Sequence, residues 1–161
     1  MLGPLRYRLM RQLGRLTVET AALLTFRRMP PMVSAAGLIR RGDQILMIRD
    51  TAQGMLVLPG GHLHWMESPE EGLRREVREE TGYDVEPTRL FRVYASDSGL
   101  SDRGIVRIMF EGAITGGSEV SSSEGEVEWV PLVGIEKDRS RDAEIIRQWL
   151  KEGPPVVSPI S

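Results

Sequence analysis

One helix in the middle of the chain has both of its ends marked in the sequence. Ser68, followed by Pro69 and then by Glu71 at the third position, forms a capping box, which predicts a helix start. Gly82 is typical of the residue that ends a helix. Because successive helical residues turn by about 100°, these two limits fix which side chains share a face.

Three glutamates share one face of this predicted helix. Glu76, Glu79 and Glu80 stand at positions i, i+3 and i+4, so their like charges lie within one turn and repel. Taken alone, such a charge run more often marks a solvated surface helix. A divalent cation would relieve the repulsion, and carboxylate oxygens suit Mg²⁺ or Mn²⁺. The residues around the three glutamates are needed to decide between a solvated surface helix and a metal site.

The rest of the helix separates into a buried face and a basic face. Leu73 and Val77 fall together on the first, and two arginines, Arg74 and Arg78, fall on the second. Arg75 lies one turn before Glu79, where its guanidinium could hold that carboxylate. A glycine, Gly72, lies within the acidic face although it costs about 1 kcal/mol relative to alanine, which predicts the close approach of another group.

Residues 61–83 match the pattern G-x5-E-x7-R-E-U-x-E-E-x-G-U without a mismatch, where U is a large apolar residue. This pattern resembles the Nudix box, and the segments Leu58–Gly61 and Glu126–Val130 look like the flanking loop and the late strand of that family. The matching residues are Gly61, Glu67, Arg75, Glu76, Val77, Glu79, Glu80, Gly82 and Tyr83.

The resemblance implies an α/β fold, the Nudix α/β/α sandwich with a mixed β-sheet. It also implies a hydrolase that acts with Mg²⁺ or Mn²⁺ on a nucleoside diphosphate linked to another group. By position in the motif, Arg75 would orient a carboxylate and Glu67 would support the cluster. The implied metal ligands are Glu76, Glu79, Glu80 and a backbone carbonyl of Gly60 or Gly61.

Several residues beside the motif are candidates for other roles. His62 and His64 alternate, and we expect substrate-contacting or structural roles rather than a second metal site. Trp65 either stacks on a base or is simply an exposed or packed aromatic side chain. With Met66 it replaces the Pro and Gly that the family often has there. A further acidic ligand or general base outside the motif could be Glu124, with Glu126 and Glu128 as competitors.

Substrate identity is the least constrained part of the prediction. Markers that accompany the motif in relatives cleaving ADP-ribose, coenzyme A or diadenosine polyphosphates are absent here. A MutT-like nucleoside triphosphate pyrophosphohydrolase is therefore the default prediction. The alternatives are a hydrolase of ADP-ribose or another NDP-sugar, and a binding module that keeps the fold without catalysis; the intact glutamates argue against the latter.

The chain of 161 residues is long enough for one domain with a sizeable core. We expect an N-terminal extension over 1–31, the Nudix domain over 32–152 and an irregular tail over 153–161. Hydrophobic alternation and turn residues predict one further helix and six short strands. The strands are Val33–Arg40, Gln44–Arg49, Met55–Leu58, Arg89–Ser96, Ile105–Glu111 and Glu126–Val130, with a Gly- and Ser-rich connection at Gly112–Gly125, and the helix is Asp142–Lys151.

The N-terminal extension is predicted to be an amphipathic helix with a leucine stripe. Residues 1–28 contain six arginines and one acidic residue, Glu19, whereas the remainder is acidic. We expect the stripe to pack on its own domain or on a second subunit in a homodimer, in preference to an anionic membrane surface. No apolar run reaches the roughly 18 residues of a membrane span, and no convincing signal peptide precedes the domain.

Charge and cysteine content limit the partners. The formal net charge is −2, so bulk charge predicts no affinity for nucleic acid, and a cation must help to attract a phosphorylated small molecule. The absence of cysteine excludes disulfides and thiolate metal sites, and agrees with a cytoplasmic location.

Overall fold

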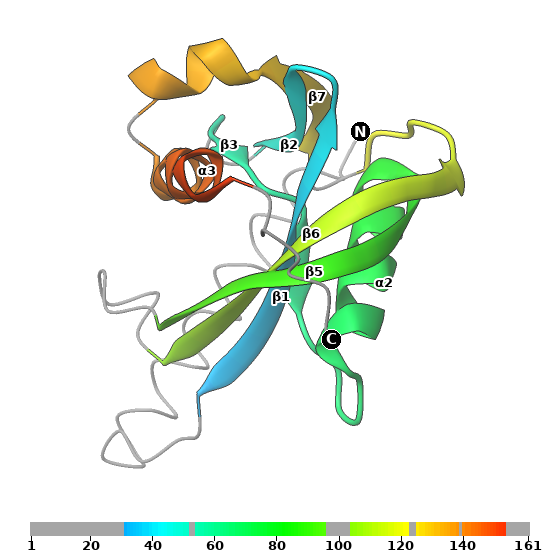
Figure 1. The fold of residues 1–161 in the computed structure, drawn as a ribbon. Helices are drawn as coiled ribbons and strands as arrows, with labels where there is room; N and C mark the ends of the chain where they lie inside the picture. The colour runs from blue at the N-terminus through cyan, green and yellow to red at the C-terminus, as the bar shows by residue number, and fades with distance from the viewer. Residues whose placement is uncertain (1–30, 52–53, 96–103, 123–124, 139, 154–161) are drawn as a thin grey trace, which may run out of the picture.

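The computed structural model describes residues 31–51, 54–95, 104–122, 125–138 and 140–153. The colours of Figure 1 follow its elements from the N-terminus to the C-terminus. The elements are β1 (Met32–Arg41), β2 (Gln44–Asp50), β3 (Leu56–Val57), β4 (Gly60–His62), α2 (Pro69–Thr81), β5 (Tyr83–Ala95), β6 (Ile105–Gly117), β7 (Gly125–Pro131), the 3-10 helix η1 (Leu132–Lys137) and α3 (Arg141–Glu152).

A mixed sheet forms the centre of the molecule. Its strand order is β3-β2-β1-β6-β5, with β4 added to β1 and β7 added to β2. Strands β1 and β6 run parallel, whereas β5 and β6 form a long antiparallel pair. Figure 1 shows α2 and α3 on opposite sides of the strands. The predicted α/β fold with a mixed sheet is therefore confirmed.

Alternate residues of β1 contribute to two separate apolar cores. Ala36 and Leu38 belong to the core that includes the buried residues of α3. Their neighbours Ala35 and Ile39 belong to the core that includes the buried residues of α2. Strand β2 alternates in the same way. Both strands read as nearly continuous apolar runs because both of their faces are covered.

Helix α2 begins and ends where the sequence predicts. The Ser68 side chain accepts a hydrogen bond from the Glu71 N–H, the Glu71 carboxylate accepts one from the Ser68 N–H, and Gly82 ends the helix at φ 76°. Leu73 and Val77 are fully buried. The two apolar side chains thus attach one face of α2 to the sheet and leave its acidic face directed elsewhere.

Other predicted elements are observed with small changes. The first two strands pair as a hairpin, with Arg40 opposite Ile45. The last helix is Arg141–Glu152. Its residues Ile145 and Ile146 are buried, whereas Leu150 is 41% exposed.

The predicted connection at 112–125 is wrong over its first half. Strand β6 continues to Gly117, and β5 begins at Tyr83 rather than at residue 89, so the two strands pair along most of their length. The glycines here reflect close packing instead of a loop: a Cβ on Gly117 would lie 2.3 Å from the carbonyl oxygen of Gly82. A glycine in a strand often marks such an approach.

The predicted N-terminal helix and the tail after residue 153 lie outside the described residues. No helix in the described part of the chain is long and apolar enough to cross a membrane. The proposed limits of the N-terminal extension and of the tail stay predictions.

The glycine that ends α2 should be much harder to replace than the glycine of the β1–β2 turn. Gly82 and Gly42 have similar positive φ values, 76° and 62°. A Cβ at Gly82 would lie 2.3 Å from the Ser118 carbonyl oxygen, whereas a Cβ at Gly42 meets nothing within 4 Å. We expect Gly42→Ala to lower the free energy of unfolding by about 1 kcal/mol and Gly82→Ala by roughly 2 kcal/mol or more. Urea denaturation measures both, and equal losses would contradict the steric argument.

Candidate active site

The guanidinium of Arg75, at the middle of α2, joins three segments of the chain. It donates to both carboxylate oxygens of Glu67, at 2.8 and 2.9 Å. It also donates to Glu76 at 2.8 Å and to the carbonyl of His62 in β4 at 3.0 Å. The distance to the Glu79 carboxylate is longer, 3.7 Å. The predicted clamp is therefore present, but its principal partner is Glu67 and not Glu79.

Glu67 is held from a second side as well. Its Oε2 atom accepts a hydrogen bond from the His64 N–H at 2.8 Å. The hydrogen bonds from Arg75, followed by the one from His64, lower the pKa of Glu67 from its usual 4.5 to about 2. Hydrogen bonding to Glu67 is likewise the main reason that the pKa of Arg75 is raised. Glu67 is therefore an anion throughout the neutral pH range.

The three glutamates of the acidic face have different surroundings. Glu80 is 9% exposed and accepts a hydrogen bond from the Gly60 N–H at 2.8 Å. The side chain of Glu76 is 15% exposed, and that of Glu79 is 62% exposed. Among the residues that the structure describes, no three carboxylate or imidazole side chains converge as a metal-ligand set. The predicted set Glu76, Glu79, Glu80 and Gly61 stays a prediction.

The main chain of β4 lies directly against this acidic face. A Cβ on Gly61 would be 2.4 Å from the carboxylate carbon of Glu76, so a larger residue at this position would displace that carboxylate. Gly60 has φ 145°, and a Cβ there would be 2.2 Å from the carbonyl oxygen of Ala35. The site therefore combines carboxylates with closely placed backbone. Such a donor set fits a hard divalent cation like Mg²⁺ or Mn²⁺.

Gly72 does have a close neighbour, as its position on the acidic face predicts. A Cβ there would be 2.3 Å from a methyl carbon of Leu63 and 3.3 Å from the Glu67 carboxylate. Leu63 packs against the apolar core under α2. The glycine therefore allows the loop before α2 to pack on the helix. The sequence predicted the close approach without identifying Leu63.

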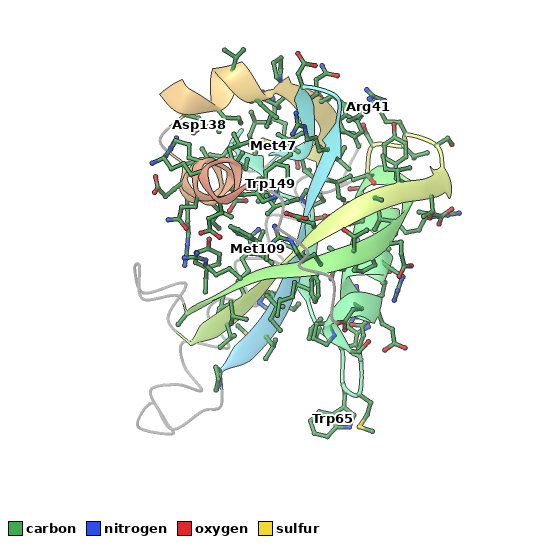
Figure 2. All side chains as sticks on the ribbon, viewed as in Figure 1. Arg41, Met47, Trp65, Met109, Asp138 and Trp149 are labelled. Carbon is green, nitrogen blue, oxygen red and sulfur yellow. The ribbon has the colours of Figure 1, made fainter. Side chains whose placement is uncertain are left out.

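The loop before Glu67 has an exposed aromatic tip. The Glu67 N–H donates to the His64 carbonyl at 3.2 Å, which closes a turn with Trp65 and Met66 at its centre. Met66 adopts φ 67°, a conformation that glycine favours, and Trp65 is 93% exposed. Figure 2 shows Trp65 projecting from the tip, away from the rest of the molecule. Of the two structural alternatives, Trp65 is thus exposed and not packed.

The histidines contribute main-chain groups to the site. His62 supplies a carbonyl to Arg75, and His64 supplies an N–H to Glu67. Both residues are exposed. Their predicted substrate contacts stay predictions, since the described hydrogen bonds at this site use their backbone atoms.

The three candidates for a further acidic ligand or general base outside the motif differ in their surroundings. Glu124 lies outside the described residues. Glu126 is exposed, whereas Glu128 accepts hydrogen bonds from both Nε and Nη2 of Arg49, which lower its pKa. This strong pairing makes Glu128 a poor proton acceptor.

The sequence did not predict one carboxylate that binds the backbone just before β4. Asp142, in the first turn of α3, accepts a hydrogen bond from the Leu58 N–H at 2.7 Å. The sequence signals an acidic residue near a helix start, which the helix dipole favours. It contains nothing that relates Asp142 to a residue 84 positions away.

The sequence matches the description NUDIX domain over residues 30–149. The chain belongs to the Nudix family. This agrees with the resemblance that residues 61–83 carry, and it extends the match across the whole sheet, α2 and most of α3.

Individual relatives and structures agree with this assignment. A MutT-like protein from Streptomyces ambofaciens is 44% identical over 105 residues, which cover 63% of this chain and 66%, just under two thirds, of that protein. An ADP-ribose pyrophosphatase from Methanocaldococcus jannaschii is 28% identical over 125 residues, covering 75% of this chain and 74% of that protein. The crystal structure of a MutT protein from Methanosarcina mazei superposes with a TM-score of 0.67 at 26% identity, covering 78% and 96% of the two chains.

The ion pair between Glu67 and Arg75 should make stability depend on pH at acidic values. Because the pKa of Glu67 falls from 4.5 to about 2 on folding, its stabilising contribution is complete above pH 4.5 and is lost as the pH falls towards 2. We expect wild type to exceed Glu67→Gln in free energy of unfolding by the largest margin above pH 4.5. Chemical denaturation at a series of pH values measures this margin, and a constant margin across that range would contradict the assignment.

Proposed function

We propose that this chain is a Nudix pyrophosphohydrolase, which cleaves a phosphoanhydride bond in a nucleoside diphosphate linked to another group. The observation that carries the proposal is the acidic face of α2, which has all three glutamates, Glu76, Glu79 and Glu80, and lies against the β4 backbone. Arg75, Glu67 and the close approach at Gly61 orient this face. The family match over 30–149 supports the same reaction class.

A divalent cation, Mg²⁺ or Mn²⁺, would be held by Glu76, Glu79, Glu80 and the backbone carbonyl of Gly61. When bound, the cation would offset the charge of the phosphate chain and favour deprotonation of water near neutral pH. Arg75 fixes the direction of Glu76, and Glu67 in turn fixes Arg75. Arg75 and Glu67, which are not proposed ligands, thus hold the proposed ligand Glu76 in position.

In the proposed reaction, the oxygen of a water molecule attacks phosphorus, and the bond from phosphorus to the bridging oxygen breaks. The leaving phosphate takes the bonding electron pair, and a carboxylate accepts the water proton. This carboxylate is that of Glu76, Glu79, Glu80 or Glu124. Among Glu76, Glu79 and Glu80, the most exposed side chain is that of Glu79, which makes it the most accessible to water and substrate.

The default substrate is a nucleoside triphosphate, which would give a monophosphate and pyrophosphate. The MutT-like name of the Streptomyces relative supports this choice. We propose that His62, His64 and Trp65 contact the substrate, because they are exposed at the end of β4 and on the loop that leads from it to α2. A base stacked on Trp65 would be recognised with little selectivity, since every base offers an aromatic face.

A second candidate substrate is ADP-ribose or another NDP-sugar. The Methanocaldococcus relative is named an ADP-ribose pyrophosphatase, and the alignment covers about three quarters of both chains. The metal site would serve either substrate, because both contain a diphosphate. The choice between a nucleoside triphosphate and an NDP-sugar would depend on the residues that contact the group linked to the nucleoside diphosphate.

Removing a single carboxylate charge from the acidic face should abolish most activity. We expect Glu79→Gln and Glu80→Gln each to lower kcat at least about a hundredfold, because each change removes a charge that holds the cation and keeps the side-chain shape. Glu70→Gln is the matched control, since Glu70 is an exposed glutamate in the first turn of the same helix. Steady-state kinetics with Mg²⁺ and with Mn²⁺ measure the effect. Near-normal turnover in both variants would contradict the assignment.

A substrate panel in heavy-oxygen water should show both the preferred substrate and the bond attacked. The panel contains nucleoside triphosphates, NDP-sugars, ADP-ribose, diadenosine polyphosphates and coenzyme A. We expect a triphosphate to be cleaved fastest, with the heavy oxygen in a phosphate product, because water attacks phosphorus.

Faster cleavage of ADP-ribose or an NDP-sugar would change the substrate and leave the metal site intact. Heavy oxygen on a sugar carbon would contradict the mechanism. No hydrolysis of any compound would favour a non-catalytic binding module.

A further inference from the structure

Asp142 is a buried carboxylate that connects α3 to two other parts of the chain. It is 5% exposed. Its Oδ1 accepts from Nη1 of Arg107 at 2.6 Å, and its Oδ2 accepts from Nη2 of the same residue at 3.3 Å. Oδ2 also accepts from the Leu58 N–H at 2.7 Å. Both oxygens are therefore engaged, one of them by the backbone of the segment that leads into β4.

That segment, Leu58–Gly60, is held at three consecutive residues by three different elements. Leu58 donates to Asp142 in α3, and the Pro59 carbonyl accepts from the Gly37 N–H of β1 at 2.9 Å. Gly60 donates to Glu80 in α2 at 2.8 Å. The segment lies between the two helices, so its position depends on contacts at both of its ends.

We propose that Asp142 is a positioning residue of the active site, with Arg107 as its counterion. Through the Leu58 N–H it fixes the backbone that presents the Gly60 N–H to Glu80 and that leads into Gly61. The inference rests on the proposed function of the acidic face. It adds α3 and β6 to the elements that set the geometry of that face.

The chemistry of the contact favours positioning over simple burial. A buried ion pair is weak support for stability, because the cost of desolvating both charges offsets their attraction. An apolar pair would fill the same space without that cost. A carboxylate that accepts a backbone N–H also fixes the distance and direction of that backbone, because hydrogen bonds to charged groups are short and strong.

The experiment compares Asp142→Ala, Asp142→Asn and a control on the same helix, Glu144→Gln. Asn keeps a side-chain oxygen for the Leu58 N–H, whereas Ala does not. Glu144 is exposed and pairs with Arg147 and Gln148 on its own helix, and within the described part of the chain it makes no hydrogen bond to Leu58–Gly60. Three quantities are measured for each protein: the melting temperature, the hydrogen exchange rate of the Gly60 amide by NMR, and kcat and KM separately.

We expect Asp142→Ala to raise the exchange rate of the Gly60 amide at least tenfold relative to core amides of β1. We also expect its kcat to fall at least tenfold, with a change in KM of less than about threefold. The Gly60 exchange rate and the kcat of Asp142→Asn should lie between those of wild type and Asp142→Ala. Glu144→Gln should match wild type.

A fall in melting temperature with normal kcat and an unchanged relative exchange rate at Gly60 would overturn the proposal, because it would show a purely structural role. If neither Asp142 variant folds, Arg107→Lys decides by the same measurements. This variant keeps the Asp142 carboxylate but replaces the two guanidinium donors of Arg107 with a single ammonium group. An exchange rate of the Gly60 amide equal to that in Glu144→Gln would count against the proposal.

The outcome is separable from the proposed function. The exchange measurement needs no turnover, so it tests the positioning role even if wild type hydrolyses no compound. Conversely, loss of activity in Glu80→Gln with full activity in Asp142→Ala would support the function and refute the positioning role.

Discussion

The rest of the site depends on the guanidinium of Arg75. It contacts β4 through a carbonyl, the loop before α2 through Glu67, and α2 itself through Glu76. A lysine could not replace it, since a single ammonium cannot present two parallel donors to one carboxylate and still reach two further acceptors in other directions. The charge also offsets part of the repulsion among the glutamates. Arg75 is therefore both a geometric and an electrostatic element of the site.

Glycines permit the close contacts that this arrangement requires. Gly61 lets the β4 backbone meet Glu76, and Gly72 lets Leu63 pack on the helix. The acidic face consequently lies against main chain over part of its area and faces solvent at Glu79. Three residues of one chemical type thus differ in burial and in hydrogen bonding. Their sequence spacing gives them a common face but does not give them a common environment.

Local features of the sequence predicted the structure best. The capping box at Ser68 and the stop at Gly82 depend on neighbouring residues, and both were confirmed. The extent of the β5–β6 pair was missed because strand pairing is decided by distant residues, and glycines such as Gly117 signal both loops and close approaches.

The same limit applies within the site. The helical spacing of the glutamates could be read from the sequence, and so could the presence of an arginine clamp. The choice of Glu67 over Glu79 depends on how the loop before α2 folds back, and the partner of Asp142 lies in another part of the chain. Neither is encoded in a short pattern.

The alternation of β1 between two cores has a consequence for how this chain can vary. Inserting one residue within the strand would move each side chain beyond it to the opposite face, so that residues shaped for the α3 side would face α2, and the reverse. A two-residue insertion would preserve the faces but shift the parallel register with β6. Length changes should therefore be tolerated at the turns of this fold and selected against within β1 and β2.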